Sequence, residues 1–364
     1  MRSLSPARRL GGARSNGAGD QPVRRRACGG EDCEGVVSAL DLLTAIASQS
    51  ATDDTTEKYC PVKTLVRRFL TQKQRRALAE LRDVSIGMVA VLLSWLLKLL
   101  PQYVQAALHE RWVTVAKMDY ASHEIYLHID STIEYWARRN ACMKEPETVR
   151  WIEEFIGSGE VVFDVGANVG SYSLLIEKHT GGHAKVYAFE PTFANFAQLN
   201  RNIHLNRCGG YIIPLCIALA SQTGIVIMNY SSLLPGAALH AVGTAVDNKG
   251  GTFKPAFRQP VMSYRMDDLV GQFVEQPNHI KLDVDGIELD VLKGAERTLA
   301  DPALKTILVE LEPGLITYQL TIDFLKAKGF RIQSFRQHGT GYLDTGNYLF
   351  VRASELPSQS HAEV

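Results

Sequence analysis

Several features that mark other protein classes are missing from this chain of 364 residues. Its 39 basic and 39 acidic residues cancel, which argues against a protein that binds nucleic acid across its whole surface. The six cysteines form no Cys-x-x-Cys pair and have no histidine at zinc-ligand spacing. We therefore expect free thiols and a reducing compartment, the cytoplasm.

No apolar run is long enough for a standard membrane-spanning helix. The longest, 86–97, falls short of the about 20 residues that such a helix needs. We predict an apolar helix over 84–100 within a helical extension, 61–115. Two alternatives stay open: this helix packs in a soluble core, or residues 63–100, which begin with a basic stretch, attach to an anionic membrane surface.

The two ends of the chain lack apolar periodicity. Residues 1–60 are rich in arginine, glycine, serine and proline and contain no signal-peptide core. This composition predicts a disordered basic leader. An organelle transit peptide, or a leader translated from an upstream start codon, is the alternative. At the other end we expect a polar tail over 353–364.

The stretch 161–171, Val-Val-Phe-Asp-Val-Gly-Ala-Asn-Val-Gly-Ser, predicts a strand, a glycine turn and the start of a helix. Gly166 and Gly170 permit positive φ and close approach of a ligand to the backbone. The middle glycine of a dinucleotide turn is absent, and Asp164 would repel a pyrophosphate. A cationic nucleoside such as S-adenosylmethionine suits this turn, with Asp164 and the 166–170 backbone, Asn168 included, against its methionine part.

Glu190 follows the second predicted strand, 184–189, and lies 20 residues beyond Gly170. An acid at this distance accepts hydrogen bonds from ribose hydroxyls in nucleoside-binding α/β folds. Asn195 and Ala218 are candidates to border the adenosine. The alternatives for the whole pattern are a turn that serves packing alone, and a nucleotide-dependent oxidoreductase, which the missing Gly-x-Gly-x-x-Gly disfavours.

From residue 161 onward, strands and helices alternate, which predicts a doubly wound, mostly parallel sheet. Pro214 in the third strand suits an edge position. We expect the polar stretch 220–262, with short strands such as Gly224–Tyr230, to be an insertion over the active-site edge. Before the sheet, Trp136 and Trp151 are expected in the core, the second on a helix over 146–156.

A second predicted site follows the fourth strand. Strand periodicity places Lys281, Asp283 and Asp285 on one face, and Glu310 and Glu312 share a face of the next strand. If the two strands are neighbours, a lysine and several carboxylates converge beside the bound nucleoside. Such a concentration of like charge is costly unless a cation or a shared proton offsets it.

Three interpretations of this cluster stay open. In the first, Asp283, Asp285 and a glutamate bind Mg²⁺, which orients a substrate hydroxyl. In the second, a metal-free site takes the hydroxyl proton with an acid whose pKa is raised, or with Lys281 if burial lowers its pKa, and the catalytic candidates are Lys281, Asp283 and Asp285. In the third, Lys281 and Asp283 form an ion pair at the end of the strand, without a catalytic role.

Four motifs in this order resemble the FkbM family of S-adenosylmethionine-dependent methyltransferases, over about 120–352. They are Phe163-Asp164-Val165-Gly166-Ala167-Asn168-Val169-Gly170, Phe189-Glu190-Pro191, Ile280-Lys281-Leu282-Asp283-Val284-Asp285-Gly286-Ile287-Glu288 with Leu292-Lys293-Gly294-Ala295, and Asn347-Tyr348-Leu349-Phe350. One departure is Asp285, where the family more often has a glutamate.

The resemblance implies a seven-stranded, Rossmann-like methyltransferase sheet over 116–352, preceded by the helical extension. It also implies methylation of a hydroxyl group on a small molecule such as a sugar or secondary metabolite. A non-catalytic module of the same fold, tethered through residues 63–110, is the alternative. Neither the acceptor nor the oligomeric state follows from the sequence.

Overall fold

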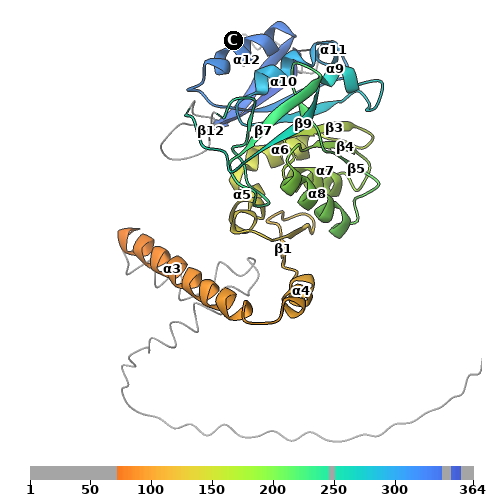
Figure 1. The fold of residues 1–364 in the computed structure, drawn as a ribbon. Helices are drawn as coiled ribbons and strands as arrows, with labels where there is room; N and C mark the ends of the chain where they lie inside the picture. Colours follow the sequence, from red (N-terminus) through yellow and green to blue (C-terminus); the bar gives the residue numbers. More distant parts are fainter. Residues whose placement is uncertain (1–71, 246–250, 338–345, 354–364) are drawn as a thin grey trace, which may run out of the picture. The chain divides into compact units, whose positions relative to one another are not determined.

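The computed structural model describes residues 72–245, 251–337 and 346–353 (Figure 1). Contacts divide the chain into two units, Met1–Leu97 and Lys98–Val364. The described residues do not include the predicted leader 1–60, the tail after 353 or most of the loop 336–346. The three cysteines that the structure describes, Cys142, Cys208 and Cys216, are free thiols.

A seven-stranded sheet forms the centre of the second unit. From edge to edge its strands are β12 (Phe330–Gln337), β13 (Gly346–Arg352), β11 (Thr306–Leu311), β10 (His279–Leu282), β3 (Val161–Val165), β4 (Lys185–Phe189) and β5 (Ile212–Leu215). The five strands from β11 to β5 run parallel, whereas β13 pairs antiparallel with both β11 and β12. The predicted doubly wound sheet is confirmed, with β5 and its Pro214 at the edge.

Helices cover both faces of this sheet (Figure 1). One face packs against α6 (Pro146–Phe155), α7 (Ser171–His179) and α8 (Phe193–Leu205). The other packs against α9 (Met266–Leu269), α10 (Glu288–Lys293), α11 (Glu296–Ala300) and α12 (Ile316–Ala327). In β3, Val162 belongs to the first core and Phe163 to the second. This alternation also directs Asp164 toward α7.

The elements before the sheet are short. They are α4 (Gln102–Arg111), β1 (Val115–Lys117), β2 (Tyr126–His128), the π-helix η2 (Glu134–Arg138) and α5 (Ala141–Lys144). Trp151 on α6 is buried, as expected, and its indole Nε1 donates to Thr306 Oγ1. The expectation for Trp136 is wrong: its side chain is 58% exposed on η2.

A smaller sheet occupies the predicted insertion. Its order is β6 (Ala218–Leu219), β9 (Phe257–Tyr264), β7 (Gly224–Tyr230) and β8 (Ala241–Val242). The strand expected at Gly224–Tyr230 is confirmed, while the long partner β9 was not predicted. Because this sheet starts directly after β5, it stands at the carboxyl end of the parallel strands.

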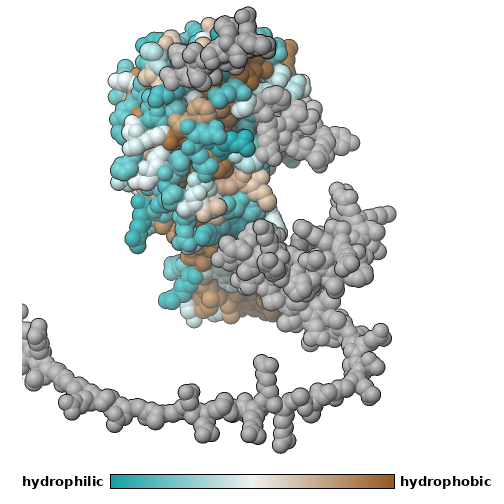
Figure 2. All heavy atoms as spheres, turned by 180° about the vertical axis from the view of Figure 1, so that it is seen from behind, coloured by the Kyte–Doolittle hydropathy of each residue, from teal (hydrophilic) through white to brown (hydrophobic). Residues whose placement is uncertain are grey.

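The face of the molecule drawn in Figure 2 is mixed, with hydrophilic side chains separated by smaller hydrophobic areas.

The first unit contains α3 (Gln72–Leu97), a helix of 26 residues. The predicted apolar helix thus exists but ends at Leu97. The side chains from Val84 to Leu96 are exposed in the structure, and both alternatives for this helix stay predictions. Within the described part of the chain, no helix combines the length and the hydrophobicity needed to cross a bilayer.

Candidate active site

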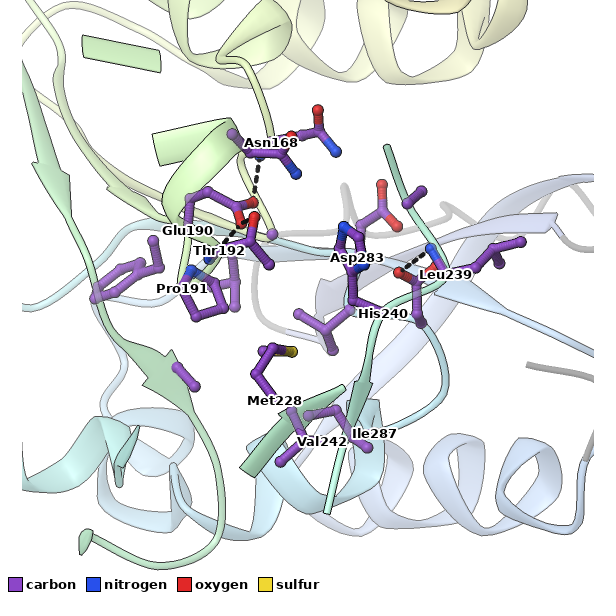
Figure 3. A pocket seen from close by; sticks show the side chains of 18 of the residues that line it. Asn168, Glu190, Pro191, Thr192, Met228, Leu239, His240, Val242, Asp283 and Ile287 are labelled. Atoms are coloured by element: carbon purple, nitrogen blue, oxygen red, sulfur yellow. Dashed lines mark hydrogen bonds between the residues drawn. The ribbon is translucent and has the colours of Figure 1, made fainter. Parts of the chain in front are cut away.

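A pocket lies at the carboxyl ends of β3, β4, β10 and β11, and the smaller sheet closes it on one side (Figure 3). It encloses about 1080 Å³, its open mouth included. Open α/β sheets bind their ligands at this edge, where the strand order reverses between β3 and β10.

The turn after β3 forms one wall of the pocket. Gly166 has a φ of 83°, and its N–H donates to the Phe189 carbonyl oxygen over 3.0 Å. A Cβ at Gly166 would lie 1.8 Å from the backbone oxygen of Asp283, so the glycine is required by the neighbouring strand end. At Gly170, with a φ of 89°, a Cβ would meet Leu199 of α8 at 2.5 Å. The two glycines therefore serve packing, with Gly166 also lining the pocket.

Glu190 follows β4 and its carboxylate is buried in the pocket wall. Oε2 accepts the N–H of Asn168 at 2.9 Å, and Oε1 accepts the N–H of Thr192 at 2.8 Å and the Thr192 hydroxyl (Figure 3). Burial raises the pKa of this carboxyl, and the hydrogen bonds from Thr192 and Asn168 oppose that shift. Glu190 thus fixes the conformation of the Gly166–Gly170 turn as well as facing the ligand space.

Asp164 lies behind the turn and is not among the pocket-lining residues. Its Oδ2 accepts the Ser173 hydroxyl of α7 at 2.5 Å, whereas Oδ1 has no hydrogen-bond partner in the described structure. Burial raises its pKa, and the charge of Lys281 opposes the rise. The sequence predicted that this carboxylate contacts the ligand. In the structure, the alternation of side chains along β3 directs Asp164 toward α7 instead.

A strap, Pro235–His240, forms the wall opposite the turn. Asn168 and Asn195 both donate to the Ala237 carbonyl oxygen, at 2.9 and 3.1 Å. Asp285 Oδ2 accepts the Leu239 N–H at 2.8 Å (Figure 3). Side chains from α8 and from the turns after β3 and β10 therefore hold the segment between β7 and β8 at the pocket.

The acidic edge predicted from the sequence exists, because β10 and β11 are parallel neighbours. Lys281 Nζ donates to Asp283 Oδ2 at 2.7 Å, which confirms the predicted ion pair. Burial alone would raise the pKa of Asp283, but the Lys281 charge, with a hydrogen bond from Glu310, holds it well below its usual range. The Asp283 charge, then burial, raises the pKa of Glu310 well above its usual range. The interaction between the two acids thus lowers the pKa of Asp283 and raises that of Glu310.

Asp285 differs from its strand neighbours because β10 ends at Leu282 and the predicted strand does not continue to Gly286. Its φ is 54°, in the left-handed region. Burial and the nearby Asp283 charge raise the pKa of Asp285 to about 7, and burial likewise raises that of Glu288 to about 7. Asp285 lines the pocket because the turn after β10 directs it there, and not because it continues the alternation of the strand.

Two pocket cations come from the region before the sheet, and the sequence did not indicate them. Lys144, at the end of α5, pairs with the buried Glu145 at 2.7 Å and lines the pocket beside Asp283 and Glu310. Arg138 of η2 lines it too, and its Nη2 donates to the Gly236 carbonyl oxygen at 2.8 Å. No motif surrounds either residue, and only the fold brings them to this edge.

The structure therefore divides the predicted site residues into two groups. Gly166, Asn168, Glu190, Asn195, Ala218, Asp283, Asp285 and Glu310 line the pocket. Asp164, Gly170 and Lys281 lie behind that lining, and Lys281 is buried against the Tyr172 ring at 4.9 Å. Among the residues that the structure describes, no three histidine, cysteine, aspartate or glutamate side chains are arranged to hold a metal ion.

Comparisons with known proteins agree with this architecture. The family model of the methyltransferase FkbM domain matches residues 164–332. The chain is 30% identical over 196 residues to methyltransferase sdnD of Sordaria araneosa, a match that covers 48% of this chain and 75% of that protein. This chain belongs to the FkbM methyltransferase family. The predicted resemblance is confirmed, and family membership implies S-adenosylmethionine as the methyl donor.

Two further relatives complete the comparison of this FkbM domain. A hexuronic acid methyltransferase, AglP, of Haloferax volcanii is 29% identical over 202 residues, which cover 55% of this chain and 75% of that protein. A crystal structure of an FkbM methyltransferase from Methylobacillus flagellatus matches with a TM-score of 0.39 and 20% identity. That match covers 53% of this chain and 44% of the other.

Proposed function

We propose that this protein transfers the methyl group of S-adenosylmethionine to a hydroxyl oxygen of a small acceptor, a sugar, a lipid or a secondary metabolite. The observation that carries the proposal is that one pocket joins Glu190 and the Gly166 turn to Asp283 and Lys144. The relative named a hexuronic acid methyltransferase supports a sugar-type acceptor.

The first side of the pocket fits the methyl donor. A carboxylate accepts about four hydrogen bonds, and Glu190 accepts three from Asn168 and Thr192, so one acceptor position remains for a ribose hydroxyl. Asn168 and the backbone at Gly166 would border the methionine part, and Ala218 the adenosine. When bound, S-adenosylmethionine would supply a sulfonium methyl group: the acceptor oxygen would bond to the methyl carbon as the carbon–sulfur bond breaks, and S-adenosylhomocysteine would leave.

The second side of the pocket would bind and orient the acceptor. The Asp283 carboxylate is ionised and accepts a hydrogen bond from the acceptor hydroxyl, which aims the oxygen into the pocket. The hydroxyl oxygen becomes positively charged as it gains the methyl group, so even a carboxylate with a low pKa takes the proton from it. Lys144 and Glu310 border the same space and favour the ionised form of Asp283 by lowering its pKa.

A labelled-methyl transfer screen over hydroxylated sugars, lipids and polyketides tests this proposal, alongside calorimetry with S-adenosylhomocysteine and NAD. We expect S-adenosylhomocysteine to bind, NAD not to bind, and label to appear on an oxygen of at least one acceptor. Label on nitrogen or carbon would replace O-methylation by another transfer. Binding of neither nucleoside would contradict the enzyme proposal.

The second candidate is a non-catalytic module of the same fold, tethered through residues 63–110. Nothing in the pocket favours it, because Glu190 and Asp283 are both present and positioned at the ligand space. S-adenosylhomocysteine binding without transfer to any acceptor in the screen would favour this candidate over the enzyme.

A further inference from the structure

The apolar half of α3, which we define as Val84–Leu96, has a surface unlike that of the catalytic domain. These thirteen residues contain no charged side chain, and the structure exposes every one of them. Exposure reaches 68% at Met88 and 70% at Val91. Exposed apolar surface on this scale marks a site of interaction in a soluble environment.

The apolar side chains surround this half of the helix instead of forming one stripe. Val84, Ile86, Met88, Val89, Val91, Leu92, Leu93, Trp95 and Leu96 are all exposed large hydrophobics. With 3.6 residues per turn, consecutive positions from 88 to 93 point in every direction around the axis. A groove on a protein, or a second copy of this helix, covers one side of it, whereas lipid acyl chains surround a helix on all sides.

The flanking charges fit a lipid surface. The part of α3 before Val84 contains four basic and two acidic residues in its sequence, and Lys98 follows the helix. Arginine and lysine beside an inserted segment are attracted to anionic headgroups, by about 1 kcal/mol each. Trp95 near the end is the residue type that prefers the headgroup boundary.

The length of the apolar half excludes a simple span. Thirteen helical residues extend about 20 Å at 1.5 Å per residue, against a hydrocarbon core of about 30 Å. A helix of this length stays within one leaflet, among the acyl chains, and the long basic side chains at its ends reach back to the headgroups.

We propose that Val84–Leu96 inserts into one leaflet of an anionic bilayer and thereby anchors the protein at a membrane surface. The proposal rests on α3 alone and is independent of the proposed methyl transfer. The partner is lipid and not a protein, because apolar side chains surround the helix on all sides and basic residues lie before and after them.

Flotation of the full-length protein with vesicles tests the anchor. Phosphatidylcholine vesicles with about 30 mol% phosphatidylglycerol are compared with phosphatidylcholine alone. We expect binding to the anionic vesicles that high salt weakens, because salt screens the basic flank. The double variant Val91→Asp, Trp95→Asp should lower the partition coefficient at least about tenfold. Both side chains are exposed, so folding of the catalytic domain should be unchanged.

The matched control is Ile316→Asp, Leu320→Asp on α12, another pair of exposed apolar residues, at 87% and 52% exposure. This variant should bind vesicles as the wild type does. The proposal is overturned if the wild type fails to float, or if the α3 variant floats equally well. It is also overturned if the α3 variant leaves vesicle binding intact and converts a dimer into a monomer in light scattering, since the helix then covers a second copy.

Discussion

Lys281 Nζ donates a hydrogen bond to Asp283 Oδ2 over 2.7 Å, yet the two side chains stand at different depths. The lysine side chain is 3% exposed and the aspartate side chain 27%. Burial alone would lower the pKa of Lys281, but the charges of Asp283 and Asp164 raise it above its usual range. The lysine is therefore a fixed counter-ion, and the aspartate is the partner that faces the pocket.

Replacing this counter-ion should cost stability. Lys281→Met leaves Asp283 and Asp164 in a buried region without their nearest cation, and we expect the free energy of unfolding to fall by about 3–5 kcal/mol. Urea denaturation followed by tryptophan fluorescence measures the change. Lys185→Met, which breaks the exposed ion pair with Glu275, is the control and should cost less than about 1 kcal/mol. Equal losses in the two variants would contradict the assigned role.

The two neighbouring acids should respond oppositely to amide substitution. The pKa of Asp283 is lowered and that of Glu310 is raised, so Asp283→Asn removes a charge that the acceptor needs, whereas Glu310→Gln should be the milder change. We expect kcat to fall by about 10²-fold or more for Asp283→Asn and by less than about threefold for Glu310→Gln. Initial-rate methyl transfer decides this, and the reverse order would exchange the roles of the two acids.

Gly166 and Gly243 form a matched pair, since their φ values are 83° and 78°. A Cβ at Gly243 meets nothing within 4 Å, but at Gly166 it meets the Asp283 oxygen at 1.8 Å. Gly243→Ala should cost only the left-handed strain of about 1–2 kcal/mol. Gly166→Ala should cost a further about 1–3 kcal/mol from overpacking, and should weaken nucleoside binding. Thermal unfolding of both variants measures the two losses of stability. Equal losses would contradict the role assigned to the close approach of Gly166 and Asp283.

Glu190→Gln should weaken nucleoside binding. The amide nitrogen would replace one carboxylate oxygen and face the N–H group of either Asn168 or Thr192, which now donates to that oxygen, and the ribose would lose an ionic acceptor. We expect the Kd for S-adenosylhomocysteine to rise about tenfold to hundredfold in calorimetry. Glu177→Gln is a control, because Glu177 is equally buried but accepts from Cys208 away from the pocket. An unchanged Kd for Glu190→Gln would remove this residue from the binding site.

Asp285 should make stability depend on pH. Its folded pKa of about 7 lies above the ordinary aspartate value, so the folded protein favours the protonated form. Its contribution to stability is full below about pH 4 and is lost as the pH rises through about 7. The asparagine of Asp285→Asn cannot ionise. The unfolding midpoint of the variant, relative to that of the wild type, should therefore increase as the pH rises from 4 to 8. A difference that stays constant over this range would place the pKa of Asp285 near its ordinary value.

The sequence by itself determined the alternation of strands and helices in a mostly parallel sheet and the two motif-bearing turns. Apolar runs of strand length that alternate with helical periodicity permit few other arrangements, and a glycine turn followed by Glu190 at fixed spacing identifies the nucleoside side. Local patterns also identified Gly224–Tyr230 as a strand and placed Pro214 at an edge, because a proline cannot donate to a central ladder.

Only the tertiary structure decided which of these residues reach the pocket. Asp164 and Lys281 turn toward the α7 side of the sheet, since side chains in a strand alternate and the neighbouring helices fix which face is which. Lys144 and Arg138 enter the site from two short helices without a motif, α5 and η2, brought there by long-range packing alone. The raised pKa of Glu310 follows from its position beside Asp283, which the parallel pairing of β10 and β11 sets and no spacing along the chain can give.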